Sequence, residues 1–289
     1  MATIVGQGAF RYAVDKNWGR GPAGVPSFGL ISGVACDSED RVYVFHRSPD
    51  PRVMVFGRDG NFLRSWGEGA FQHPHGIFIT LRDEVYLTDR DAHQVTKWTT
   101  RGTPIRRWGT NGQAGAPGQP FNQPTHAVEA SDGDMYVSDG YGQFRVHRFD
   151  PSGYLVHSWG EEGTGPSQFA LPHDVWVDSR NRVLVCDREN ARVQLFDRSG
   201  QYLGEWAGRK NPMQIVERDE ILYVAEALQQ VSIMDLEGRI LSTWGSHGER
   251  DDQFTDAPHA IWVDSRGDIY VTEVVALNFC ECSLSDLIA

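Results

Sequence analysis

The chain has 289 residues, with 27 Lys or Arg against 39 Asp or Glu, so its net charge is -12. This length is ample for a well-buried core, and the negative charge argues against a general nucleic-acid or anionic-membrane surface. Residues 1–19 show no basic segment followed by an apolar run, and no later window approaches the ~18 apolar residues of a membrane span. We therefore expect a single domain over residues 1–289 in the cytoplasm, with no nucleic-acid or membrane partner.

A tryptophan phrase recurs along the chain and divides it into units. It reads "DKNWG", "LRSWG", "IRRWG", "LVHSWG", "LGEWAG" and "LSTWG", at Trp18, Trp66, Trp108, Trp159, Trp206 and Trp244. The intervals of roughly 40 to 50 residues are typical of propeller blades. In residues 173–208 the runs "HDVWVD", "RVLVCD", "ARVQLFD" and "QYLGEWAG" are separated by turn residues, which predicts a four-stranded antiparallel meander and an all-β fold.

Six such units follow, so the sequence predicts a six-bladed β-propeller. The last unit has two readable strands and then runs into "ALNFCECSLSDLIA", while the N-terminal "AFRYAVDKNWG" has a fourth-strand phrase with no strands before it. We therefore expect the N-terminal strand to join the C-terminal blade and close the ring. Residues 276–289 are expected to be an irregular strand or tail.

The four cysteines give neither a disulfide framework nor a zinc-finger spacing. Cys36 and Cys186 lie in apolar runs and are expected to be small buried residues. Cys280 and Cys282 form a C-x-C pair in the tail, which is weak evidence for a soft metal.

A Pro-His phrase precedes three first strands, in "FQHPHGIFIT", "FALPHDVWVD" and "FTDAPHAIWVD". In the aligned units the same position is held by Ser32, His75, Thr125, His173, Met213 and His259. Histidine thus occupies every second blade, so three imidazoles about 120° apart are predicted to converge on the channel axis. Three neutral imidazoles with an open position suit a catalytic Zn²⁺, although Fe²⁺, Mn²⁺ or Co²⁺ would also fit. The alternative is that these histidines only pair with backbone carbonyls.

The other histidines are not predicted to join this site. His126 stands one residue out of register, so strand alternation is expected to turn it away from the three. Loops or outer strands are expected to leave the others in solvent, namely His73, His93, His147, His157 and His247.

The turns after the second strands form the next ring of residues on the same face. Asp89, Asp139 and Asp187 are expected to cap these turns through backbone N–H groups. The next position of the aligned turns holds Arg47, Arg90 and Arg188 in three of the units. Tyr141 lies one residue beyond this position in its own turn. An arginine in a loop is often only solvated, but beside a metal channel a guanidinium suits a substrate carboxylate.

Six phrases in this order carry a family resemblance: "FHR", "PTHAV", "YVSDGYGQFRV", "FALPHDV", "CDRENARVQLF" and "APHAI". Over about residues 31–275 the chain resembles the lyase domain of peptidylglycine α-amidating enzymes, the peptidyl-α-hydroxyglycine α-amidating lyase family. The resemblance implies a six-bladed propeller of NHL type. It also implies a reaction in which an N-acyl-α-hydroxyglycine is split into an amide and glyoxylate.

The resemblance also implies roles for particular residues. His75, His173 and His259 match the zinc ligands, Tyr141 matches the catalytic tyrosine, and Arg47 and Arg188 match the active-site arginines. This chemistry is consistent, because a metal acidifies a hydroxyl, an arginine binds a carboxylate and a tyrosine can accept the hydroxyl proton. One departure concerns a structural calcium, to which the family's aspartate after the third histidine contributes. In this chain Ala260 occupies the position of that aspartate, which counts against a calcium site. Ala257 occupies the position at which the family commonly has methionine.

The sequence thus predicts a zinc-dependent carbon-nitrogen lyase whose partner is a small or peptidyl α-hydroxy-amide. Two alternatives remain open. The same three histidines could serve a zinc-dependent hydrolase of a small amide or ester. A non-catalytic NHL propeller could instead bind protein or RNA, although such binders usually show a basic or aromatic patch, and they give no reason for histidine in every second blade.

Overall fold

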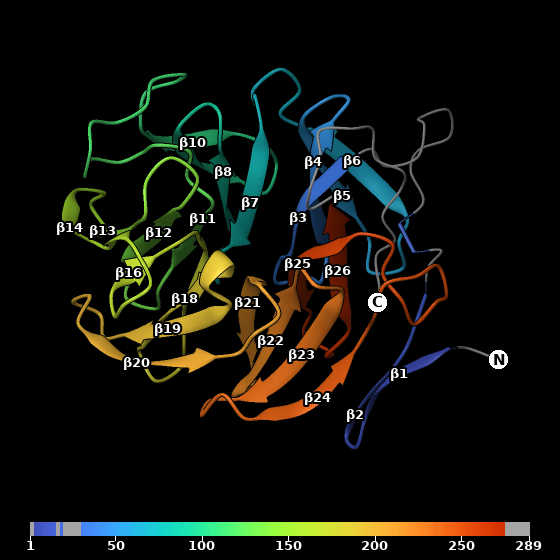
Figure 1. Ribbon diagram of the computed structural model, residues 1–289. Helices are drawn as coiled ribbons and strands as arrows, with labels where there is room; N and C mark the ends of the chain where they lie inside the picture. Colours follow the sequence, from blue (N-terminus) through green and yellow to red (C-terminus); the bar gives the residue numbers. More distant parts are fainter. Residues whose placement is uncertain (1–2, 16–17, 20–29, 275–289) are drawn as a thin grey trace.

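A computed structural model describes residues 3–15, 18–19 and 30–274 (Figure 1). The described residues form β-strands and one short 3-10 turn, η1 (Arg188–Asn190). No helix among them is long and apolar enough to cross a membrane. The molecule is an all-β propeller, as the spacing of the tryptophan phrases predicted.

Five four-stranded antiparallel sheets, blades 1 to 5, make up most of the ring. Blades 1 to 3 contain β3 (Leu30–Cys36), β4 (Val42–Ser48), β5 (Arg52–Phe56) and β6 (Phe62–Trp66); β7 (Pro74–Ile79), β8 (Glu84–Asp89), β9 (Gln94–Thr99) and β10 (Pro104–Trp108); β11 (His126–Glu129), β12 (Met135–Asp139), β13 (Arg145–Phe149) and β14 (Leu155–Trp159). Blades 4 and 5 contain β17 (Pro172–Val177), β18 (Val183–Asp187), β19 (Arg192–Phe196) and β20 (Tyr202–Ala207); β21 (Pro212–Arg218), β22 (Ile221–Glu226), β23 (Gln230–Asp235) and β24 (Ile240–Trp244).

Three smaller sheets complete the described structure. Each has two strands, and the pairs are β1 (Ile4–Gln7) with β2 (Phe10–Ala13), β15 (Glu161–Glu162) with β16 (Gln168–Phe169), and β25 (Ala257–Val263) with β26 (Ile269–Val274). The β25–β26 sheet lies between blades 5 and 1, where β25 packs beside β21 and β3. The six inner strands β3, β7, β11, β17, β21 and β25 therefore surround one central channel (Figure 1).

The prediction of six four-stranded blades is wrong for the described residues, which show five such blades and one two-stranded sheet. Closure by an N-terminal strand was not confirmed either. The strand expected to join the last blade, β2, pairs with β1 in a hairpin, so residues 4–13 satisfy each other's backbone groups. The hairpin packs on blade 5, where Tyr12 and Trp244 have ring centroids 5.6 Å apart. The expected tail at residues 276–289, with Cys280 and Cys282, lies outside the described residues.

Apolar side chains between neighbouring blades form the core. The rings of Trp66 and Trp98, from blades 1 and 2, have centroids 5.6 Å apart. Trp18 makes a similar contact, with its ring centroid 5.6 Å from that of Phe56 and 5.2 Å from that of Tyr270. Burial of such faces is the main driving force for the packing of sheets.

A β-bulge interrupts the inner strand at the same place in several blades. The register shifts between residues 74 and 76, 172 and 174, 212 and 214, and 258 and 260. A bulge places two residues opposite one and breaks the alternation of side chains. Each bulge includes the repeat position that holds histidine in blades 2 and 4 and in β25, so this irregularity shapes the channel wall.

Candidate metal centre

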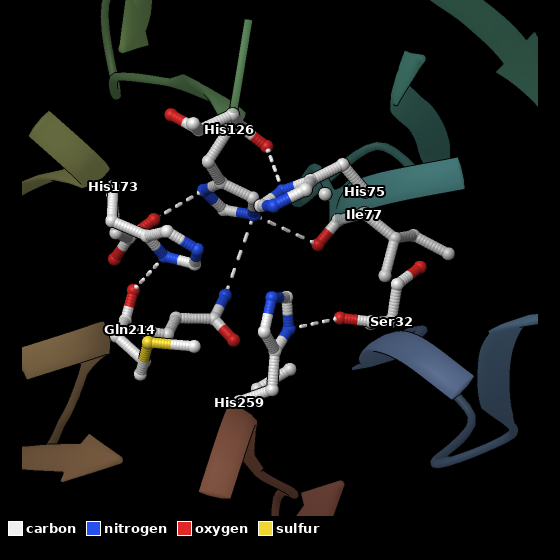
Figure 2. A pocket seen from close by; sticks show the side chains of 13 residues that line it. Ser32, His75, Ile77, His126, His173, Gln214 and His259 are labelled. Atoms are coloured by element: carbon white, nitrogen blue, oxygen red, sulfur yellow. Dashed lines mark hydrogen bonds and ion pairs between the residues drawn. The ribbon is translucent and has the colours of Figure 1, made fainter. Parts of the chain in front are cut away.

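Three histidines from alternate positions around the ring meet in the channel (Figure 2). The ring centroids of His75, His173 and His259 are 4.9, 5.0 and 5.0 Å apart, so they form a nearly equilateral triangle. One candidate ligand atom from each lies within 4.8 Å of the other two, and the residues are 2%, 2% and 4% exposed. Three nitrogen donors at this separation can hold one metal ion.

Backbone carbonyls orient all three imidazoles in the same way. His75 Nδ1 lies 2.8 Å from Thr125 O, His173 Nδ1 lies 2.7 Å from Met213 O, and His259 Nδ1 lies 2.7 Å from Ser32 O. These carbonyls belong to the equivalent repeat position of the next unit, so histidines and carbonyl partners alternate around the channel. A carbonyl only accepts hydrogen bonds, which assigns the proton to Nδ1 and leaves the Nε2 lone pair for a metal.

The electrostatics of the triad favour neutral imidazoles. Burial is the main cause that holds the pKa of each histidine well below its ordinary value. Nearby cationic groups add to this, because Arg47 acts on His75 and His259, and Arg188 acts on His173 and His259. A metal requires deprotonated ligands, so the donor set fits a divalent transition ion.

Tyr141, from the turn between β12 and β13, brings its phenol to the triad. Its Oη lies 3.3 Å from the Nε2 atoms of His75 and of His173. Arg188 Nη1 lies 3.4 Å from the same oxygen. The phenol oxygen is therefore next to two of the three nitrogen atoms that could hold a metal ion.

The two arginines matched by the resemblance both reach this region. Arg47, at the end of β4, donates from Nε to Pro74 O at 2.9 Å, next to His75. Arg188, in η1, pairs with Glu189 at 2.7 Å and contacts Met213 Sδ at 3.8 Å. The structure thus brings together all six residues that the sequence singled out for the site.

The turn aspartates bind backbone amides, but mainly those of the loop before the first strand rather than those of their own turns, where Ala92 N donates to Asp89 at 3.2 Å. Asp89 accepts hydrogen bonds from the N–H groups of residues 72 and 73 at 2.7 and 2.8 Å. Asp139 accepts from Asn122 N at 2.8 Å, and Asp187 accepts from Ala170 N at 2.9 Å. These contacts tie each turn to the loop that enters the first strand, which fixes the residues around the channel mouth.

The structure corrects the expectation for three histidines predicted to be in solvent. His93 is partly buried, and its Nδ1 accepts a hydrogen bond from Gln123 N at 3.0 Å. His147 is fully buried, because its Nε2 lies 3.2 Å from the turn aspartate Asp139. His73 is partly buried beside Arg47 and Arg90, and burial, followed by these two cations, lowers its pKa to about 3. His157 and His247 are exposed, as predicted.

His126 was predicted to turn away from the three histidines; it stays outside the triad, but it does not leave the channel. Its ring lies in the channel next to the triad (Figure 2). Nδ1 lies 2.6 Å from Asp174 Oδ1, whose charge favours the protonated imidazolium, while Nε2 lies 3.1 Å from Ile77 O and 3.3 Å from the amide nitrogen of Gln214. Burial opposes this charge, but the charge and hydrogen bond of Asp174 outweigh it and raise the pKa of His126. A Cβ at Gly76 would lie 2.4 Å from the ring, so glycine makes room for it.

The same layer of the channel does not suit calcium. Ala260, which follows the third histidine, offers no side-chain oxygen, and the His126 ring faces the neighbouring carboxylate. Calcium takes six to eight oxygen ligands. A cavity of about 10 Å³ lies between the residues of this layer and the triad, which is room for about one water.

The fold and the channel site define a β-propeller of NHL type. The profile of the NHL repeat matches residues 169–196. The chain belongs to the family of NHL repeat-containing protein 3, since it is 33% identical to that protein of Homo sapiens over 92% of this chain and 82% of the relative.

Two further comparisons bear on the site and the fold. The chain is 29% identical to the probable peptidyl-alpha-hydroxyglycine alpha-amidating lyase pgal-1 of Caenorhabditis elegans, over 58% of this chain and 55% of that protein. Among solved structures, a streptogramin B lyase has a TM-score of 0.62 at 13% identity, over 86% of this chain and 91% of that one. The first comparison relates the chain to lyases, and the second supports the fold alone.

Proposed function

We propose that the protein is a zinc-dependent carbon-nitrogen lyase that splits an N-acyl-α-hydroxyglycine, or a related α-hydroxy-amide, into an amide and glyoxylate or a related α-oxo acid. The observation that carries this proposal is the position of Tyr141 Oη, 3.3 Å from the free Nε2 atoms of two buried histidines. The lyase name of the Caenorhabditis elegans relative supports the same reaction class.

His75, His173 and His259 would hold the ion through Nε2, each fixed by its Nδ1 contact to a carbonyl. When bound, the zinc ion supplies Lewis-acid polarisation of a substrate oxygen. The rigid Nδ1 contacts limit reorganisation of the ligands, because the three carbonyls belong to strands or turns of separate sheets.

Tyr141 would act as the general base. Its oxygen takes the proton of the substrate hydroxyl, and the O–H electron pair forms the C=O bond of glyoxylate. The C–N pair leaves with the amide nitrogen, to which the phenol returns the same proton. Arg188, 3.4 Å from the phenol oxygen, stabilises negative charge on that oxygen. Arg47, held against Pro74 O beside the triad, is placed to bind the α-carboxylate.

Product analysis combined with metal analysis tests this proposal. Protein purified without added metal is analysed for transition metals and then incubated with N-benzoyl-α-hydroxyglycine. We expect one zinc ion per chain, with benzamide and glyoxylate in equal amounts. Benzoate as the product would instead indicate a zinc-dependent hydrolase on the same three histidines. No conversion by metal-loaded protein would leave the non-catalytic binding propeller as the better description.

A further inference from the structure

Arg90 is a third arginine at the channel mouth to which the proposed reaction assigns no role. It follows β8, and its backbone N–H donates to His73 O at 3.0 Å. Its guanidinium carbon lies 5.3 Å from the ring centroid of Tyr141, compared with 5.8 Å for Arg188. Arg90 therefore lies beside the phenol proposed as the base.

Arg90 also orients His73, which offers a second donor at the same place. Arg90 Nη2 lies 3.3 Å from His73 Nδ1. His73 Nδ1 also lies 3.3 Å from Asp91 Oδ2. In the tautomer in which Nδ1 accepts from Arg90, which can only donate, the neutral ring carries its proton on Nε2. The Nε2 atom is buried and has no hydrogen-bond partner among the described residues. A buried N–H without an acceptor is unfavourable, and an anionic ligand would satisfy it.

The contacts of Arg90 leave part of its donor set for a ligand. Asp91 accepts from Nε at 2.8 Å and from Nη2 at 3.2 Å. Within the described part of the chain, Nη1 has no such partner. Arg90 pairs with Asp91 and Arg188 pairs with Glu189, while the turn aspartates Asp89, Asp139 and Asp187 are buried against backbone amides. The mouth therefore gathers three guanidinium groups, whose donors suit an anionic ligand.

We propose that Arg90 and His73 form a second anion-binding subsite at the channel mouth, and that the preferred substrate carries a carboxylate on its acyl part. This inference rests on the proposed function. An α-hydroxyglycine unit has one carboxylate, which Arg47 binds in the proposed reaction. A second negative charge must therefore belong to the acyl group, and the protein would prefer dianionic N-acyl-α-hydroxyglycines to neutral-acyl ones.

Binding of two matched probes tests the subsite without turnover. N-succinylglycine and N-butanoylglycine have acyl chains of the same length, and only the first has a carboxylate on it. Neither has the α-hydroxyl that the reaction needs, so neither is cleaved. In calorimetric titrations we expect the zinc-loaded protein to bind N-succinylglycine at least about 10-fold more tightly, the usual effect of a charge-assisted hydrogen bond.

Substitutions of the two subsite residues test whether they cause the preference for N-succinylglycine. Arg90→Gln and, separately, His73→Ala should each reduce the affinity ratio to about 3 or less. Arg218→Gln is the matched control, because Arg218 also pairs with the next residue, Asp219, but lines a cavity that contains no residue of the triad. Its ratio should match that of the unmodified protein.

Equal affinities for the two probes, failure of both to bind, or an unchanged ratio in Arg90→Gln would overturn the subsite. The proposed reaction fails separately. If the dianionic probe binds more tightly but N-succinyl-α-hydroxyglycine yields no glyoxylate, the subsite stands and the lyase assignment does not.

Discussion

Replacement of His126 by alanine should destabilise the propeller strongly, although this residue is not a ligand of the proposed metal. The imidazole is 4% exposed and lies 2.6 Å from Asp174 Oδ1. Asp174 is 1% exposed, and its described hydrogen bond comes from Ile215 N at 2.8 Å. Without His126 the carboxylate would remain buried beside one amide and an empty space bounded by Gly76.

Loss of one partner from a buried ion pair costs about 3–5 kcal/mol. For a chain of this size each kcal/mol lowers Tm by roughly 2–4 °C, so the melting temperature should fall by about 6–20 °C. The pKa of His126 is raised in the folded protein, so its contribution to stability is complete below about pH 6.5. The contribution is lost as the pH rises through the folded pKa.

A double-mutant cycle at pH 6 measures this pair. The free energy of unfolding is determined by urea denaturation for His126→Ala, Asp174→Asn and the double variant, with His157→Ala as an exposed control. Because Asp174→Asn removes the stranded charge, the double variant should be less destabilised than the sum of the single variants by about 0.5–3 kcal/mol. Additive losses, or a loss below about 1 kcal/mol in His126→Ala, would contradict a charged pair in the channel.

Three other predictions concern the ions and the triad. His173→Ala should lose the bound transition metal, and its circular dichroism should stay that of the folded propeller. The exposed control His157→Ala should keep the metal. An unchanged metal content in His173→Ala would exclude this histidine as a ligand. Thermal melts with and without a calcium-selective chelator should coincide, because Ala260 supplies no ligand; a large calcium-dependent shift would show that other oxygens bind it. Metal-free protein should lose stability as the pH falls below about 6.5. His75, His173 and His259 have lowered pKa values in the folded protein, so the unfolded chain binds more protons than the folded one. Each histidine should lower the free energy of unfolding by up to about 1.4 kcal/mol per pH unit. Urea denaturation at pH 5, 6 and 7 measures this slope, and a flat profile would contradict it.

The repeat pattern was sufficient to predict the β-propeller and to identify which histidines share a position in the channel. Turn residues and alternating apolar runs are local signals, so the strands of residues 173–208 could be read directly. Equivalent positions in repeated blades lie at equal depth, which is why the spacing of His75, His173 and His259 was informative. The convergence of the three imidazoles could therefore be anticipated before any contact was known.

The remaining features depend on tertiary contacts that no local pattern encodes. His126 lines the channel although it stands one residue out of register with the triad, and strand alternation alone did not predict this position. His147 is buried because an aspartate from another strand binds it. His73 and Arg90 meet only when the loop before β7 and the turn after β8 fold together. Among the described residues the number of complete blades was also wrong, since β1 and β2 pair with each other rather than with the β25–β26 sheet.

The turnover of Tyr141→Phe at constant metal content tests the central claim most directly. This change removes only the phenol oxygen, which lies 3.3 Å from two triad nitrogens, and it leaves the three histidine ligands in place. With N-benzoyl-α-hydroxyglycine, kcat should fall by about 10²- to 10⁴-fold, the usual contribution of a general base, while the affinity for N-benzoylglycine and the zinc content stay unchanged. Full activity in metal-loaded Tyr141→Phe would contradict the assignment of this phenol as the base of a lyase.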